Sequence, residues 1–255
     1  MAATRSAEFR KFIIDDCEIP VRIFYERRKN VRVAQGKDAV LLRIPRFCGR
    51  RERQRFQQWC DQWITGQWRT NQSFRSHFMP FEIDRVHAFR TFDRTFRVTV
   101  ARDDRKSPAF KLRGGHIALQ LPASWDHTAR NAGAHRLIHK ALVAAYRHVL
   151  TARVQALHGG AFGKPVEDVR LKLMSSKWGS CSHHGRVTLS TRLLFATEEV
   201  LDYVILHELC HLDVLNHSPA FWQRVAGIDP GYRAKETWLR QHGHTCDVKF
   251  ALIDA

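Results

Sequence analysis

The stretch VLDYVILHELCHLDVLNHSPAFW, residues 200–222, places three histidines and a glutamate directly after an apolar run. Its apolar positions fall on nearly every side of a helical turn, which predicts a buried helix over about residues 197–214. His207 and His211 are four residues apart, so they lie on one face of that helix, one turn from each other. Two buried imidazoles at this spacing need a shared partner, and the HExxH pattern that they form is typical of a zinc site.

The third histidine, His217, requires the chain to change direction. A helix that continued beyond His211 would point His217 away from the other two imidazoles. Asn216 can take the left-handed conformation that ends a helix, and Ser218 followed by Pro219 is the N-cap and first-turn proline that begin a new one. The sequence therefore predicts a helix, a sharp turn and a second helix, with His217 at the turn.

The types of these side chains indicate catalytic rather than structural zinc. Three imidazoles leave one position of a tetrahedral ion open, whereas structural zinc usually takes thiolates, and no cysteine here has a suitable spacing. Glu208 is expected to be the general base, which takes a proton from a zinc-activated water and passes it to the leaving amine. We therefore expect a zinc-dependent metallopeptidase (cofactor Zn2+) that acts on a peptide or protein substrate. The group that stabilises the transition state stays open among Tyr232, Arg192 and His184.

The composition and charge indicate which other functions and partners are plausible for this protein. The chain has 255 residues, with 42 Lys and Arg against 25 Asp and Glu and a net charge of +17, so nucleic acid is a plausible partner. One alternative is therefore a basic nucleic-acid-associated protein, or a protease acting on DNA-bound proteins, whose zinc site has little intrinsic activity. Another is a zinc hydrolase of a non-peptide amide. Because no apolar run is long enough for a membrane span and the N-terminus lacks an apolar signal core, we expect a cytoplasmic protein without a membrane partner.

The rest of the chain alternates between strand and helix patterns. We expect a β-meander over 20–45, an amphipathic helix over 49–69, strands over 81–121 with a hairpin turn at Gly114-Gly115, a long helix over 126–157, a linker over 158–165, a strand over 169–174, and helices over 219–226 and 231–242. This predicts an N-terminal β-meander and helix region over 1–160 and a metallopeptidase core over 161–255. His135 and His139 on the long helix have a spacing that could hold a metal, but no third ligand is obvious nearby, so we expect a solvated basic face there.

Several of these segments together resemble the YgjP-like metallopeptidase family. They are WGSCS at 178–182, HELCHL at 207–212, NHS followed by FW at 216–222, GYRAKETWLRQHG at 231–243 and the opening ERRKNVRVAQGKDAVLLRIP at 26–45. The resemblance implies an α+β fold with a minimal, gluzincin-like zincin core, in which the metal helix packs beneath a mixed sheet. It also carries the three metal ligands over to His207, His211 and His217, and the general base to Glu208. Gly231 departs from the aspartate common in the family, and residues 70–130 match poorly, as an insertion or a divergent sheet would.

The WGSCS segment is also similar to a segment of SprT-type DNA–protein crosslink proteases. This similarity suggests that a substrate peptide lies along residues 178–190 as an added strand. For Trp178 we expect core packing, and for Gly179 and Gly185 a role in turn geometry rather than in chemistry.

Overall fold

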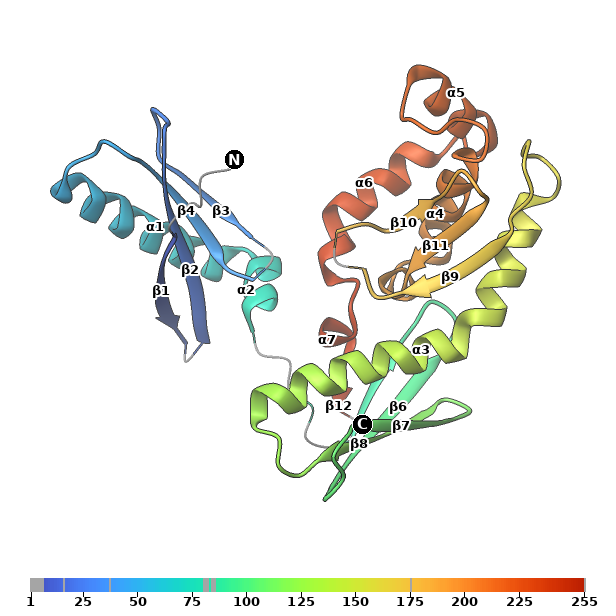
Figure 1. Cartoon of the computed structure of the whole chain (residues 1–255), viewed down its shortest axis with the longest axis horizontal. Helices are drawn as coiled ribbons and strands as arrows, with labels where there is room; N and C mark the ends of the chain where they lie inside the picture. The colour runs from blue at the N-terminus through green and yellow to red at the C-terminus, as the bar shows by residue number, and fades with distance from the viewer. Residues whose placement is uncertain are drawn as a thin grey trace. The chain divides into compact units, whose positions relative to one another are not determined.

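The structure of the chain is a computed structural model that describes residues 7–15, 17–36, 38–79, 83, 86–174 and 176–254. Its contacts divide the chain into two compact units, Met1–Pro80 and Phe81–Ala255 (Figure 1). The division falls at residue 80 and not at the expected boundary of 160/161. The physical reason lies in the long helix of the second unit, which packs against elements on both sides of residue 160.

The first unit is a four-stranded sheet with helices on one face. Its elements are β1 (Ala7–Ile14), β2 (Cys17–Glu26), β3 (Arg32–Gln35), β4 (Val40–Pro45), α1 (Arg50–Thr70) and α2 (Gln72–Phe78). The alternating residues of β2 and β4 pack against the apolar face of the helices, which gives a core of Cys17, Ile19, Val21, Ile23, Val40, Leu42, Ile44, Cys60, Ile64, Trp68 and Phe74. On the other face of the sheet, the side chains of Phe9 and Ile13 are 71% and 66% exposed.

The predicted meander over 20–45 is wrong in its strand order. The sheet runs β1-β2-β4-β3, with β2 parallel to β4 and β3 antiparallel to β4. In a meander β3 would lie between β2 and β4. The more buried of β3 and β4 takes the inner position instead, because β4 has three residues with no exposure, whereas β3 has no fully buried residue. Alternation shows which face of a strand is buried but not which strand is its neighbour.

The second unit contains two sheets. The larger has the order β12-β5-β6-β8-β7 and the smaller the order β10-β11-β9. Their strands are β5 (His87–Arg90), β6 (Thr95–Asp103), β7 (Ala109–Arg113), β8 (His116–Pro122), β9 (Asp168–Lys172), β10 (Gly179–Cys181), β11 (Arg186–Ser190) and β12 (Ile253–Asp254). The predicted hairpin is confirmed, since β7 and β8 pair antiparallel around a turn in which Gly114 has a φ of 56°. The poorly matching segment 70–130 thus contributes four strands to the larger sheet.

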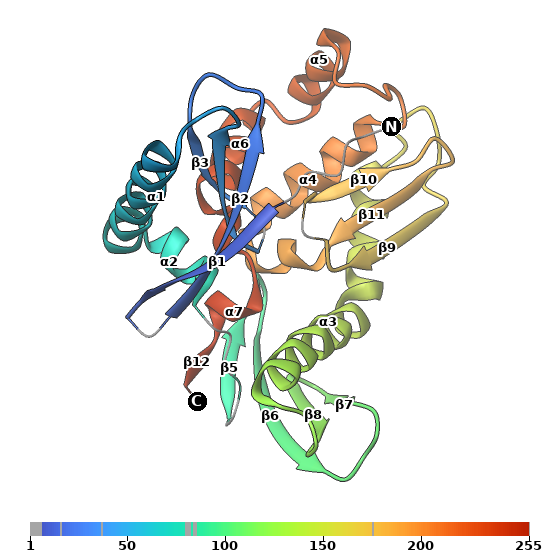
Figure 2. The same cartoon turned by 60° about the vertical axis from the view of Figure 1, so that its left-hand side comes forward.

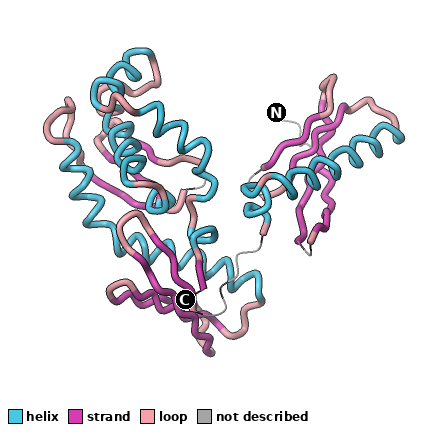
Figure 3. The backbone as a smooth tube through the Cα atoms, turned by 180° about the vertical axis from the view of Figure 1, so that it is seen from behind, coloured by secondary structure: helices cyan, strands magenta, loops and turns pink. Residues whose placement is uncertain are grey.

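A single long helix, α3 (His127–His158), contacts both sheets of the second unit (Figure 3). The Asp126 carboxylate caps its start by accepting from the N–H of Ala129 at 2.7 Å, and Gly159, with a φ of 48°, ends it. Its apolar face packs on β8 and β7 and also on β9, so one continuous core extends from Phe89 and Phe96 to Val187 and Leu189. This shared core explains why residues 158–165 connect packed elements and do not separate domains.

The remaining elements are helices and helical turns that follow β11 in the chain. They are η1 (Thr191–Phe195), α4 (Glu198–Cys210), α5 (Pro219–Ile228), α6 (Tyr232–His242), η2 (Gly243–Thr245) and α7 (Val248–Ala251). The smaller sheet is mixed, because β10 and β11 are antiparallel and β11 and β9 are parallel, and α4 packs against it (Figure 2). The expected α+β class is confirmed, and the helix on which the metal ligands are predicted packs against a mixed sheet as expected. In the described part of the chain no helix has the length and apolar character needed to cross a bilayer; the cytoplasmic location stays a prediction.

Candidate metal centre and its cleft

The helix α4 carries His207, and its C-cap residue is His211, the second histidine of the predicted site. It is apolar around most of its circumference, and eight of its thirteen residues are buried. Such a helix is held on several sides, so the direction of each polar side chain on it is fixed by packing. His207 is half-buried and His211 is 8% exposed. The sequence-based prediction that both lie on one face of a buried helix is confirmed.

His217 lies beside these two histidines. Its Nε2 atom is 3.1 Å from Nε2 of His207, and potential ligand atoms of all three rings lie within 4.8 Å of one another. The Nδ1–H of His211 donates to the Val214 carbonyl at 3.0 Å, which leaves Nε2 of that ring as its ligand atom. Burial, with smaller contributions from the charges of the other two rings, lowers the pKa of His207 to about 4. The ring is therefore neutral at pH 7, as a metal ligand must be.

The turn before His217 differs from the prediction. The helix α4 ends at Cys210, several residues before Asn216, and the N–H groups of residues 211–214 close its last turn on carbonyls of residues 208–210. Among the described residues other than glycine only Asp15 has a positive φ, so Asn216 does not take the left-handed conformation. The Asn216 side chain instead accepts from the N–H of Ser218 at 3.2 Å. Pro219 starts α5 as predicted, but the Ser218 side chain makes no capping hydrogen bond with the described residues.

Glu208 points from α4 toward the edge strand β10. Its side chain is 5% exposed, and burial raises its pKa to about 8, against smaller opposing effects of the Lys177 charge and the Cys181 backbone N–H. A Cβ atom on Gly179 would lie 2.5 Å from Oε1 of Glu208. Gly179 therefore makes room for the carboxylate, whereas Gly185, with a φ of 72°, does serve the expected turn geometry. The predicted turn role of Gly179 is thus replaced by a contact with Glu208.

The sequence that forms this site matches a known protein family. The model of the YgjP-like metallopeptidase domain matches residues 27–242. The chain belongs to the YgjP-like metallopeptidase family. Among solved structures, the chain is similar to the crystal structure of the metallopeptidase zymogen of Pyrococcus abyssi abylysin, with 31% identity over 38% of this chain and 91% of that chain and a TM-score of 0.31. No curated protein sequence matches the chain.

The peptidase has a cleft of about 580 Å³ at this site. Its lining brings together the three histidines, Glu208 and all of β10, and adds Lys177, Trp178, Tyr203, Val204, Leu215, Glu236, Leu239 and Arg240. Trp178 also packs against the core as predicted, and a Cβ on Gly243 would clash with its ring.

The three residues suggested for stabilising the transition state lie elsewhere. The described residues that line the cleft do not include Tyr232, Arg192 or His184. The Tyr232 ring stacks on Trp222 with 5.6 Å between ring centroids, and the Arg192 guanidinium donates to backbone carbonyls of Cys246 and Gly243. Tyr203, which lines the cleft one turn before His207, was not predicted from the sequence. Tyr203 lies four residues before His207, and this helical spacing, which places the two side chains on one face, is the sequence signal that could have identified it.

Proposed function

We propose that this metallopeptidase is zinc-dependent, with His207, His211 and His217 as the ligands and Glu208 as the general base. The observation that carries the proposal is that the Glu208 carboxylate and the three imidazoles open onto one cleft, which is lined along one side by an edge strand. The donor set fits the ion, because neutral imidazoles are common zinc ligands and three of them leave a position for substrate. When bound, the ion would supply Lewis-acid chemistry, polarising the scissile carbonyl and lowering the pKa of a water.

The environment of Glu208 suits proton transfer. Burial favours its neutral form in the free site, whereas a cation held by the neighbouring histidines favours the carboxylate. A carboxylate in this position accepts a proton from the attacking water and donates it to the leaving amine. Because Gly179 has no side chain, the carboxylate lies directly against β10 and so against whatever peptide occupies the cleft.

The edge strand supports the proposed position of the substrate. The strand β10 is the outer strand of its sheet, and all three of its residues line the cleft. An extended peptide binds such an edge through main-chain hydrogen bonds, which gives affinity without demanding one side-chain sequence. The WGSCS segment thus forms the wall on which a substrate strand is aligned beside Glu208.

The test compares metal content with hydrolysis. Glu208→Gln should keep zinc and the fold while casein hydrolysis falls by at least about a hundredfold, and His217→Ala should lose the bound zinc. Glu199→Gln is the matched control, because Glu199 is an exposed carboxylate at the start of the same helix. A wild-type protein that binds zinc but shows no hydrolysis dependent on Glu208 would favour a non-catalytic role.

A specific observation in the first unit favours nucleic acid as a second partner. On the sheet face without helices, the Arg22 guanidinium lies 5.5 Å from the centroid of the exposed Phe9 ring, and Arg43 lies 5.9 Å from that of Phe24. Interleaved cations and aromatic rings on a sheet suit single-stranded nucleic acid, which binds by stacking and by phosphate contacts. Arg22→Glu with Arg43→Glu should weaken binding to a single-stranded oligonucleotide and reduce its salt dependence. Equal binding by this variant and the wild type would exclude this face.

A further inference from the structure

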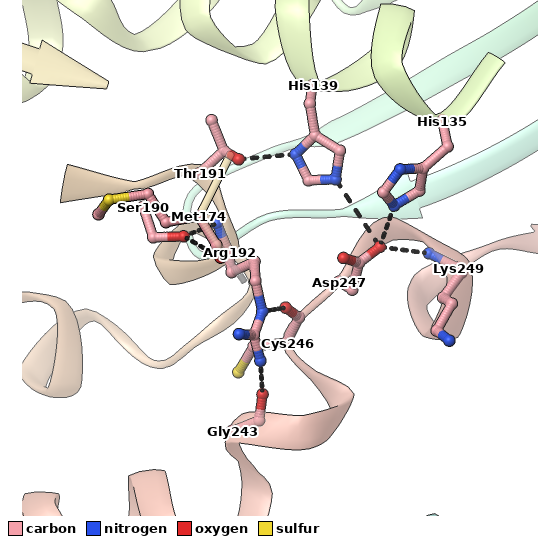
Figure 4. Close-up of polar contacts among 10 residues, drawn as sticks. All are labelled: His135, His139, Met174, Ser190, Thr191, Arg192, Gly243, Cys246, Asp247 and Lys249. Carbon is pink, nitrogen blue, oxygen red and sulfur yellow. Dashed lines mark hydrogen bonds and ion pairs between the residues drawn. The ribbon is translucent and has the colours of Figure 1, made fainter. Parts of the chain in front are cut away.

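A second group of potential metal ligands lies outside the cleft. It consists of His135 and His139, one turn apart on α3, and Asp247, which immediately precedes α7 (Figure 4). The predicted solvated basic face is wrong for these histidines, because the C-terminal segment covers this side of α3. His139 is 2% exposed, and Oδ1 of Asp247 lies 2.7 Å from Nε2 of His135 and 3.7 Å from Nε2 of His139.

The buried ring of His139 has only one of its two nitrogens satisfied. Its Nδ1 atom lies 2.7 Å from the Thr191 hydroxyl, which fixes the orientation of the ring. Its Nε2 atom is buried, makes no hydrogen bond with any described residue and is aimed at the Asp247 carboxylate, at a distance too long for a hydrogen bond (Figure 4). A neutral ring that donates from Nδ1 to Thr191 presents its Nε2 lone pair to a carboxylate oxygen. A cation shared by the two groups stabilises this arrangement.

The ionisation states of these groups match a ligand set. Burial lowers the pKa of His139 and thus favours the neutral imidazole. Burial alone would raise the pKa of Asp247, but its hydrogen bond to His135 and the nearby ring of His139 outweigh that effect and hold the pKa well below its usual range. Both shifts favour the forms of His139 and Asp247 that bind a cation, the neutral imidazole and the carboxylate.

The two nearby cations, Arg192 and Lys249, have partners outside this group. Arg192 donates to the carbonyl oxygens of Cys246 and Gly243, and its guanidinium stacks over Trp178 at 4.3 Å. Lys249 reaches Asp247 through its backbone N–H, whereas its ammonium points away from the carboxylate and lies 4.6 Å from the centroid of the Phe250 ring (Figure 4).

We infer that His135, His139 and Asp247 form a second divalent metal site, with the chemistry of a two-histidine, one-carboxylate centre. This set is a known ligand set for zinc and for other first-row divalent ions. The Thr191 hydroxyl supports His139 as outer partners support metal-binding histidines elsewhere. Its structural effect is a link between α3 and the C-terminal segment, whose last strand β12 pairs with β5.

Metal stoichiometry tests this inference independently of the proposed catalytic site. Full-length wild-type protein is saturated with Zn2+, dialysed and measured by mass spectrometry for metal per chain. We expect one ion for each of the two groups, loss of one in Asp247→Asn and in His135→Ala, and loss of the other in His217→Ala. His148→Ala is the control, since His148 is an exposed histidine of the same helix and should leave both ions in place.

Cobalt provides a second readout. Titration of the wild type with Co2+ should give two absorbing phases, of which Asp247→Asn lacks one and His217→Ala lacks the other. His135 is 24% exposed, so His135→Ala should fold even if Asp247→Asn does not. If Asp247→Asn and His135→Ala both keep the metal content of the wild type, the inference is overturned, and the three residues form only a polar cluster without a metal. A wild-type protein whose only ion is the one lost in His217→Ala would overturn it equally.

Discussion

Replacing Gly179 by alanine tests whether the Glu208 carboxylate acts from the position in which the structure holds it. The added Cβ would lie 2.5 Å from Oε1, 2.6 Å from Cγ and 2.8 Å from Cδ of Glu208. Because ordinary carbon contacts are about 3.5–4.0 Å, the carboxylate must move by roughly 1 Å. It is 5% exposed and packed on its other sides, so it must move into the cleft that it lines. Gly179 does not have a positive φ, so the backbone accepts alanine without strain.

The expected result is a loss of rate with little loss of metal. A misplacement of about 1 Å costs about a hundredfold in catalysis, which corresponds to about 2.7 kcal/mol of activation free energy. Overpacking lowers the free energy of unfolding by about 1–3 kcal/mol. Both are measured on one preparation, by kcat on a fluorogenic peptide and by urea unfolding, together with zinc content.

A matched glycine supplies the control for this substitution. Gly66 lies inside α1, and a Cβ added there would meet no neighbouring group within 4 Å, so Gly66→Ala should stabilise the protein by up to about 1 kcal/mol and leave kcat unchanged. Wild-type kcat in Gly179→Ala would refute the role given to the Glu208 position. Loss of zinc in Gly179→Ala would show that the substitution acts through the ligands instead.

Three further outcomes are expected. Asn216→Val should keep zinc affinity within about fivefold of wild type, because it removes one exposed hydrogen bond and no strained φ. Ser218→Ala should change the affinity even less. Equilibrium competition with a chromophoric chelator measures both affinities, and a large loss in Asn216→Val would indicate that Asn216 takes the left-handed conformation after all. Tyr203→Phe should lower kcat about tenfold at unchanged zinc content, since burial raises the pKa of this phenol and keeps it a hydrogen-bond donor in the cleft; an unchanged kcat removes Tyr203 from catalysis. Burial raises the pKa of Cys60 to about 11, so at pH 8 only about one thiol in a thousand is ionised, and a thiol reagent should label half-buried Cys48 well before Cys60; equal rates would mean that the first unit opens readily.

The sequence predicts that the candidate ligands lie together, because their signal is local. The spacing of His207 and His211 is a helix repeat, and the apolar run before them identifies a buried helix without any tertiary information. The position of His217 follows from the same short segment, although the conformation of Asn216 does not. Several backbone conformations bring His217 to the same place, so the grouping of the three histidines is predictable where the turn type is not.

Long-range features are the ones that the sequence does not predict. Asp247 meets His135 and His139 only because the C-terminal segment returns across α3 to pair with β5. The parallel pairing of β2 with β4 depends likewise on which buried strand faces which. Gly179 carries no positive φ and no turn signal, so its contact with Glu208 can be recognised only when β10 and α4 are seen together.

The helix α3 has a consequence for how the second unit melts. Its 32 residues span about 48 Å at 1.5 Å per residue, and one apolar face is shared by both sheets. Neither sheet can lose that face without exposing the core of the other, so we expect a single cooperative thermal transition for residues 81–255. Cleavage after Gly160 would separate α4, which carries His207, from α3 and the larger sheet. The smallest fragment able to hold the cleft open to substrate is therefore the whole second unit, and not the C-terminal third in which its motifs lie.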